Sequence, residues 1–172
     1  MIFSLPARLI HWLSAVIIIA TFVLGVWMCE AASGPQQDQL FDLHRSFGSL
    51  VLALTALRLL WRLGRPPPPL PADTPGWMRL AASLSHGSLY VLLFAQPMLG
   101  WAGSNAFGVR VGVFGLFDLP SLVAKSEPLS DLLFEAHTIL AYMLAAIVVA
   151  HIGAAFFHLI VRCDGVFNRM VG

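Results

Sequence analysis

The chain has 172 residues, of which 58% are hydrophobic and only 11% charged. A soluble domain carries about 25% charged residues, so the composition excludes a soluble globule and indicates a membrane protein. Ten basic residues are nearly balanced by nine acidic ones and form no run, which argues against nucleic acid as a partner.

The first predicted membrane span covers residues 8–30. Its stretch from Leu9 to Cys29 has no charged side chain for 21 residues. At about 1.5 Å per residue, a helix of this length crosses a hydrocarbon core of about 30 Å. The second predicted span, residues 41–63, has Arg45 near one end and Arg58 and Arg62 near the other. Long arginine side chains this close to a helix end can reach the membrane surface.

Residues 65–75 (RPPPPLPADTP) cannot form a helix, because four consecutive prolines lack amide donors and fix φ. We expect a stiff loop there, followed by a third span over residues 78–106 that Pro97 should kink. A glycine-bearing loop (GVRVGVFGLFDLPS) follows, which we expect to rest on the membrane surface. The fourth span, residues 132–162, has no charged side chain from Ala136 to Val161.

The sequence therefore predicts an all-α membrane protein, a bundle of four transmembrane helices in a single domain over residues 1–172. With an even number of spans, both termini lie on one face of the membrane. The basic residues predicted on that face are Arg8, Arg58, Arg62, Arg65, Arg79, Arg162 and Arg169. The opposite face has Arg45, Arg110 and Lys125. Because basic residues stay on the cytoplasmic side, both termini are predicted to be cytoplasmic.

Histidines are the chemically informative residues, since each would be costly if it faced lipid. All six fall on predicted helices: His11, His44, His86, His137, His151 and His158. His137 and His151 are 14 residues apart, close to four helical turns, so both lie on one face of the fourth span at two depths. At the outer end of the second span, His44 is level with His137. An arrangement of two opposed imidazoles from facing helices is the one that holds a planar metal macrocycle by both axial positions.

At the inner level, His11 can approach His151, but by depth alone His158 competes with His151 as its partner. Gly48 lies one turn below His44, where a missing side chain leaves room for a flat ring or simply for close helix packing. Arg58 is 14 residues from His44 and projects from the same face. Its cation could pair with a porphyrin propionate or only reach toward the interface.

Other readings of the histidines are weaker. A structural zinc site needs four ligands at one depth, and a proton relay favours acidic residues in the interior of the spans, where none is found. From a different class, a haem-free transporter with a histidine-lined path would also place histidines on membrane helices.

Four stretches, one on each span, carry a family resemblance. They are RLIHW at residues 8–12, LHRSFGSLVLALTALRLLWRL at 43–63, SHGSLYVLLFAQPMLGW at 85–101 and EAHTILAYMLAAIVVAH at 135–151. Together they resemble the bacterial cytochrome b561 family, of the superoxide oxidase type. More distantly, the pattern is similar to the cytochrome b subunits of membrane hydrogenases and formate dehydrogenases.

The resemblance implies two haem b groups, with His11 and His151 as iron ligands on the cytoplasmic side and His44 and His137 on the periplasmic side. It implies an oxidoreductase of the bacterial inner membrane that takes electrons from superoxide, a small anionic donor, and passes them to ubiquinone. In this assignment His158 is free to contact quinone, with His86 and Arg162 as further candidates. A polar packing role for His86 and His158 stays open, as does a homodimer. The alternative within this class is a membrane subunit of a larger dehydrogenase or hydrogenase.

Overall fold

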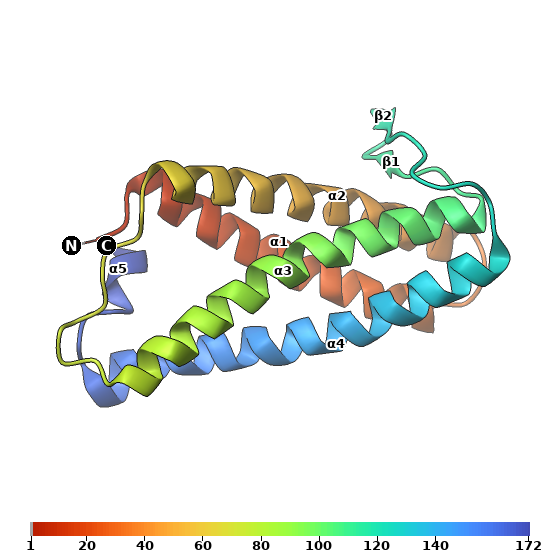
Figure 1. The fold of residues 1–172 in the computed structure, drawn as a ribbon. Coiled ribbons are helices and arrows are strands. Elements are labelled where there is room, and N and C mark those ends of the chain that lie inside the picture. The colour runs from red at the N-terminus through yellow and green to blue at the C-terminus, as the bar shows by residue number, and fades with distance from the viewer. Residues whose placement is uncertain (1) are drawn as a thin grey trace.

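The computed structural model describes residues 2–172, which form four long helices in chain order (Figure 1). These are α1 (Leu5–Glu30), α2 (Pro35–Gly64), α3 (Gly76–Phe107) and α4 (Glu127–Phe157). A π-helix, His158–Arg162, continues α4, and a short α5 (Asn168–Val171) ends the chain. As predicted, residues 65–75 contain no helix.

Proline marks where three of these helices begin, in the first turn of α1, α2 and α4. The missing amide of proline is harmless there, because the first amides of a helix have no partner within it. For α2 this signal lies at Pro35, so the helix begins six residues before the predicted span. Pro97 lies inside α3, which continues through it as one element. Gly108, with φ of +103°, ends α3 in the left-handed conformation that glycine favours.

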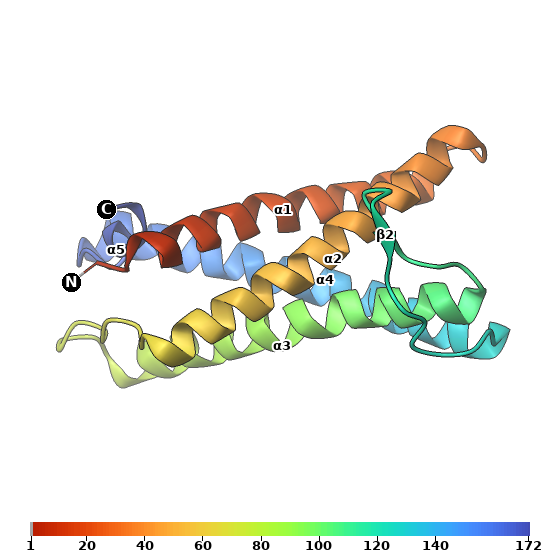
Figure 2. The same ribbon diagram turned by 90° about the horizontal axis from the view of Figure 1, so that it is seen from above.

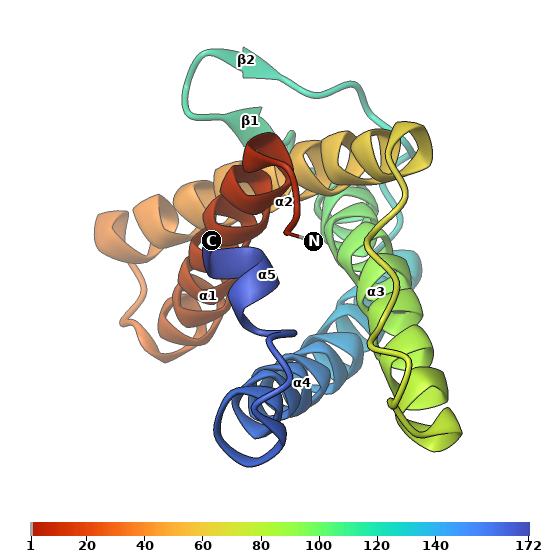
Figure 3. The same ribbon diagram turned by 90° about the vertical axis from the view of Figure 1, so that its left-hand side faces the viewer.

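The helices pair as two hairpins, with α1 against α2 and α3 against α4, and α2 joins the hairpins by packing on α3. Figure 3 shows the four helices arranged around a common axis, and Figure 2 shows α2 crossing the bundle obliquely. Buried apolar side chains on α2 and α3 include Val51, Leu54, Leu92 and Leu93. Ala106, near the end of α3, is buried completely.

Both ends of the chain lie at one end of the bundle, beside the loop between α2 and α3 (Figure 1). The Phe3 amide donates to the Arg169 carbonyl oxygen at 3.1 Å. Arg169 Nη1 donates to the Pro69 carbonyl oxygen at 2.6 Å, which fastens the C-terminal segment to the proline loop. We call this the termini end and the opposite one the hairpin end.

Within residues 2–172, three helical stretches are long and apolar enough to cross a membrane: α1, α2 and the continuous segment Glu127–Arg162. The 32-residue helix α3 is not in this group. Polar residues within it, among them His86 and Gln96, lower its mean hydropathy. Large apolar side chains such as Leu9, Val16 and Val23 are exposed on α1. An apolar exterior of this kind is suited to lipid, as expected for a membrane protein.

The glycine-bearing segment after α3 is more ordered than the predicted loop. It contains a small antiparallel hairpin, β1 (Gly112–Val113) and β2 (Phe117–Asp118). Phe114 and Gly115 at its turn have φ of +50° and +70°, which fits a type I′ turn. The Phe114 amide donates to Ser46 Oγ at 2.9 Å, and Ser46 is only 3% exposed. The hairpin is therefore fastened to α2 two residues after His44.

Candidate functional site

Each long helix carries two notable positions 14 residues apart. The pairs are His11 and Gly25 on α1, His44 and Arg58 on α2, His86 and Gly100 on α3, and His137 and His151 on α4. Fourteen residues make nearly four turns at about 3.6 residues per turn, so both members of a pair share a helix face. The hairpin level consists of Gly25, His44, Gly100 and His137. The termini level consists of His11, Arg58, His86 and His151.

At the hairpin level, the structure brings His44 and His137 together. Their ring centroids are 6.0 Å apart, and the ring planes are inclined at 83°. His44 Nδ1 donates to the Thr21 carbonyl oxygen at 2.9 Å, and His137 Nδ1 donates to the Gln96 carbonyl oxygen at 3.0 Å. A carbonyl oxygen only accepts, so the proton is on Nδ1 in both rings. Nε2 of each neutral imidazole is therefore the nitrogen available to a metal.

These rings lie against two glycines, which the sequence analysis did not single out. A Cβ on Gly25 would lie 2.9 Å from His44 Cε1, and a Cβ on Gly100 would lie 3.1 Å from His137 Cε1. Each imidazole thus lies directly against the backbone of the neighbouring helix. A glycine 14 residues after a histidine, on the same helix face, is the sequence signal that could have found both.

The same arrangement occurs twice, and we call it the glycine cradle: a backbone carbonyl that accepts from Nδ1, and a glycine four residues later against which the ring lies. In α1 the acceptor Thr21 precedes Gly25 by four residues, and in α3 the acceptor Gln96 precedes Gly100 by four. One helical turn therefore supplies both the carbonyl that orients an imidazole and the gap that receives it. The repeat relates the α1–α2 hairpin to the α3–α4 hairpin, although the sequence shows no clear internal repeat.

At the termini level three histidines meet rather than two. The His151 ring centroid lies 6.3 Å from that of His11 and 5.3 Å from that of His86, with the planes inclined at 70° and 69°. His11 Nδ1 is buried and has no hydrogen-bond partner among the described residues. The predicted partners His11 and His151 are therefore adjacent, and His86 is a third neighbour.

These residues fit a b-type haem. Two imidazoles on one iron each contribute a metal–nitrogen bond of about 2 Å and about 1 Å from nitrogen to ring centre, which separates the centroids by about 6 Å. The separations of 6.0 Å for His44–His137 and 6.3 Å for His11–His151 meet this requirement. At Gly48, one turn along α2 from His44, an added Cβ would meet no atom within 4 Å, so a flat ring has room there.

Arg58 is half-buried on α2, and its guanidinium carbon lies 5.8 Å from the centre of the Tyr90 ring. Arg62 lies over the same ring at 5.6 Å. Within residues 2–172, none of the ion pairs involves Arg58. Its charge is therefore available to an anionic group bound at the termini level.

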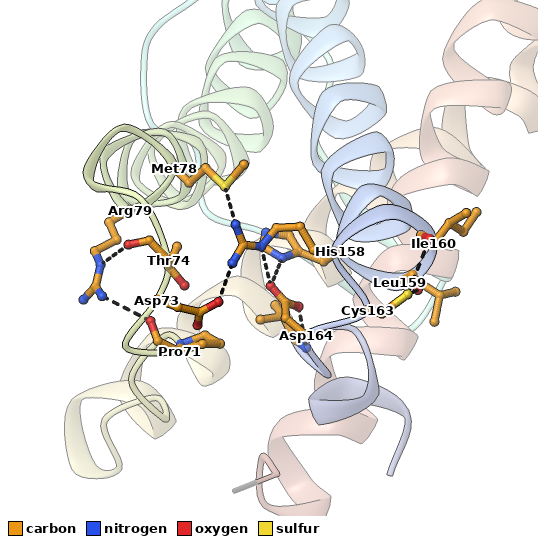
Figure 4. Close-up of polar contacts among 12 residues, drawn as sticks. Pro71, Asp73, Thr74, Met78, Arg79, His158, Leu159, Ile160, Cys163 and Asp164 are labelled. Carbon is orange, nitrogen blue, oxygen red and sulfur yellow. Dashed lines mark hydrogen bonds and ion pairs between the residues drawn. The ribbon is translucent and has the colours of Figure 1, made fainter.

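His158 lies farther toward the termini end, in a polar cluster with Asp164 and Asp73 (Figure 4). Arg162 belongs to this cluster, because it pairs with both carboxylates. His158 Nδ1 contacts Asp164 Oδ2 at 2.7 Å, and Arg162 Nε donates to the same oxygen at 2.9 Å. Burial alone would raise the pKa of Asp164, but the hydrogen bonds from His158 and Arg162 outweigh it and lower the pKa of this carboxyl.

The three cations at the hairpin end contact three different residues. Arg45 Nη1 pairs with Asp42 at 2.8 Å, and Arg110 Nη1 lies 4.0 Å from Asp118. The Lys125 side chain packs beside Gly108. Arg45 is 21% exposed at its side chain and lies next to His44 in the sequence.

A search of protein families matches residues 2–172 to the prokaryotic cytochrome b561 model. Cytochrome b561 homolog 2 of Escherichia coli (strain K12) is 37% identical over 164 residues, which cover 94% of this chain and 87% of the relative. A probable superoxide oxidase, CybB, of Yersinia pestis is 30% identical over 163 residues, covering 94% of this chain and 91% of the relative. Cytochrome b561 homolog 1 of Escherichia coli (strain K12) is 27% identical over 172 residues, covering 98% and 96%.

The sequence motifs, the helical membrane fold and the imidazole pairs agree with these matches, which extend over nearly the whole chain. The chain belongs to the prokaryotic cytochrome b561 family, whose members are membrane electron-transfer proteins that bind b-type haem.

Proposed function

We propose that this chain is a dihaem cytochrome that moves electrons across the bacterial inner membrane, from superoxide outside to ubiquinone on the cytoplasmic side. The hydrogen bonds of His44 and His137 are the observation that carries the proposal. Both rings direct Nδ1 at a backbone carbonyl and leave Nε2 for a metal, at a ring separation of 6.0 Å. A haem held by two histidines would serve electron transfer rather than chemistry at the iron.

In this proposal residues 1–172 form one domain with four membrane spans and cytoplasmic termini. The seven-to-three division of basic residues supports that orientation. The chain ends also meet at one end of the bundle, as an even number of spans requires. The helix α3, which contains the third span, has 32 residues and is about as long as its neighbours. Gln96 is buried and His86 lies beside His151, so these polar side chains face protein rather than lipid.

His44 and His137 hold the periplasmic haem, and His11 and His151 hold the cytoplasmic one. When bound, haem b supplies one-electron redox chemistry at each level. Gly48 provides room for the ring beside α2, and Arg58 provides a cation for a propionate at the termini level. Gly25 and Gly100 hold the imidazole planes at the hairpin level.

Superoxide as the donor is supported by the relative named as a probable superoxide oxidase. Superoxide is a small anion, and three cations lie at the predicted outer end. Arg45 and Arg110 face Asp42 and Asp118, whereas Lys125 is in none of the ion pairs within residues 2–172 and is the cation available to attract superoxide. Two superoxide ions give two molecules of oxygen and two electrons. These electrons, with two protons from the cytoplasm, convert one quinone to quinol.

Quinone at the termini end is supported by the chemistry that its reduction needs. Protons must reach the quinone oxygens as electrons arrive, and imidazole is the side chain suited to supply them near neutral pH. His158 and His86 are the candidates for this role, and Arg162 is the adjacent cation.

A reduced-minus-oxidised visible spectrum of the purified protein tests the class, and the haem-to-protein ratio tests the count. We expect low-spin b-type bands and two haems per chain. Rapid mixing with superoxide should reduce the haem, and adding ubiquinone-1 should then reoxidise it. A spectrum without b-type bands would leave the haem-free transporter as the better interpretation. Full haem content without reduction by superoxide would indicate a different donor, such as a partner dehydrogenase.

A further inference from the structure

A buried carboxylate lies behind His158 at the termini end. The Asp164 side chain is only 8% exposed, and Oδ2 accepts hydrogen bonds from both His158 and Arg162. Its second oxygen, Oδ1, accepts from the Val166 amide at 3.2 Å. Both oxygens of Asp164 are thus occupied by protein donors, which fixes the carboxylate in one orientation.

The contact with Asp164 determines which ring nitrogen of His158 carries a proton and which one faces another group. Asp164 is ionised near neutral pH because its pKa is lowered, so it can only accept, and Nδ1 of His158 must carry a proton. Nε2 is then the nitrogen left for another group. Because Nδ1 already holds a proton, a further proton that the ring takes up is carried on Nε2, and the ring can then donate it from that nitrogen.

We propose that Asp164 is a positioning residue that holds His158 as the proton donor to ubiquinone. This inference rests on the proposed quinone site and adds the residue that orients its donor. His158 Nε2–H gives its proton to a quinone carbonyl oxygen as that oxygen gains electrons. Nδ1–H stays on Asp164 throughout, and water on the cytoplasmic side returns a proton to Nε2. Over one cycle the quinone gains two electrons and two protons, and His158 and Asp164 end unchanged.

The His158–Asp164 pair lies close to the loop between α2 and α3 and to the start of α3; Figure 4 shows it beside Asp73 and Met78. His158 and Arg162 come from the π-helix, an irregular turn of the type often found at functional sites. Asp164 follows it, and Arg162 Nη2 reaches Asp73 Oδ2 in the loop between α2 and α3 at 3.0 Å. Arg162 Nη1 also lies 3.6 Å from Met78 Sδ at the start of α3. Arg162 therefore links the His158–Asp164 pair to the proline loop.

A small cavity adjoins His158. It has a volume of about 200 Å³, and its lining includes Cys163 and Asn168 as well as His158. A polar cavity this close to the ring gives water a place from which to reprotonate it.

The test compares haem reoxidation by ubiquinone-1 in the purified holoprotein and in D164N. Asparagine keeps the size of the side chain, but its NH2 group can turn toward Nδ1, so it no longer forces the proton onto that nitrogen. We expect the maximal rate to fall about tenfold or more, with less than a threefold change in the KM for quinone. The haem spectrum should be unchanged. D131N, a matched loss of an exposed carboxylate on α4, should reoxidise at the wild-type rate.

The split between the maximal rate and the KM separates positioning from a structural effect. A structural change at the quinone site would also alter the KM or the haem spectrum, whereas a lost proton donor lowers the maximal rate alone. Arg162 and Asp73, the other charged groups of the cluster, are unchanged in this variant. An unchanged maximal rate in D164N would overturn the role of Asp164. If D164N loses its haem spectrum, D164E becomes the test. With its spectrum intact, it should stay within threefold of wild type, and a tenfold slower rate would overturn the proposal.

H158A distinguishes this inference from the quinone site on which it rests. Slow reoxidation in H158A with a normal rate in D164N would keep the quinone site and reject the role of Asp164. A wild-type rate in H158A would reject the quinone site and, with it, this inference.

Discussion

His44 lies against the backbone of α1 at Gly25, where an added Cβ would be 2.9 Å from His44 Cε1. The contact is with the ring itself and not with the end of a flexible chain. Because the Thr21 carbonyl also holds Nδ1, the ring has little freedom to move aside. The same relationship links His137 to Gly100 at 3.1 Å.

Alanine at Gly25 or Gly100 should therefore displace an axial ligand of the haem proposed at the hairpin level. We expect G25A and G100A each to lower the haem-to-protein ratio from two toward one, or to change the low-spin electron paramagnetic resonance signal of one haem. G87A is the matched control on α3, because a Cβ there meets no atom within 4 Å. Wild-type haem content and signal in both cradle variants would mean that the glycines do not position the ligands.

Ser46 should hold the β-hairpin against α2. In S46A the Phe114 amide loses its hydrogen-bond acceptor, at a cost of about 1 kcal/mol. We expect faster proteolytic cleavage within residues 110–118 while the haem spectrum stays the same. S49A is the control, because Ser49 Oγ bonds only the Arg45 carbonyl of its own helix. Equal cleavage rates in S46A and S49A would show that other contacts hold the hairpin.

The long helices were predictable because charge-free stretches and fixed helix geometry determine them. The same geometry places residues 14 apart on one face, so the adjacency of His44 to His137 follows from spacing and depth. Depth alone left both His151 and His158 as possible neighbours of His11, and only the family resemblance favoured His151. The start of α2 was less predictable. Its first turn contains polar residues that lie before the apolar stretch, and only Pro35 marks the helix start.

Features that depend on contacts between helices were not predictable in the same way. The β-hairpin has two residues per strand and depends on Ser46, 66 residues before Gly112 in the chain. The glycine cradles require knowing which helices are neighbours. Asp164 lies after the last predicted span, so its contact with His158 depends on how the chain turns back after the π-helix.

Arg58 should raise the reduction potential of the haem proposed at the termini level. A cation near the haem favours the reduced form, which carries one positive charge fewer. In R58Q we expect the midpoint potential of one haem to fall by tens of millivolts, as measured by optical redox titration. The other haem, about 21 Å away along the helices, should change little. R65Q, at the exposed end of α2, is the control, and an equal effect in both variants would point to general surface charge.

The three histidines at the termini level make the ligand assignment there testable. His151 is 6.3 Å from His11 and 5.3 Å from His86, and only the first separation matches the distance of about 6 Å that two axial imidazoles need. H11A and H151A should each remove one low-spin haem and leave the haem at the hairpin level. H44A and H137A should do the reverse.

H86A and H158A should retain two haems with unchanged spectra, because neither residue is expected to bind iron. Their effect should be on reoxidation by ubiquinone-1, while reduction by superoxide stays near the wild-type rate. Loss of one low-spin haem in H86A with retention in H11A would exchange the roles of these two residues. Loss in H158A with retention in H151A would instead place the second ligand seven residues farther along the last span, and the quinone contact would have to be sought elsewhere.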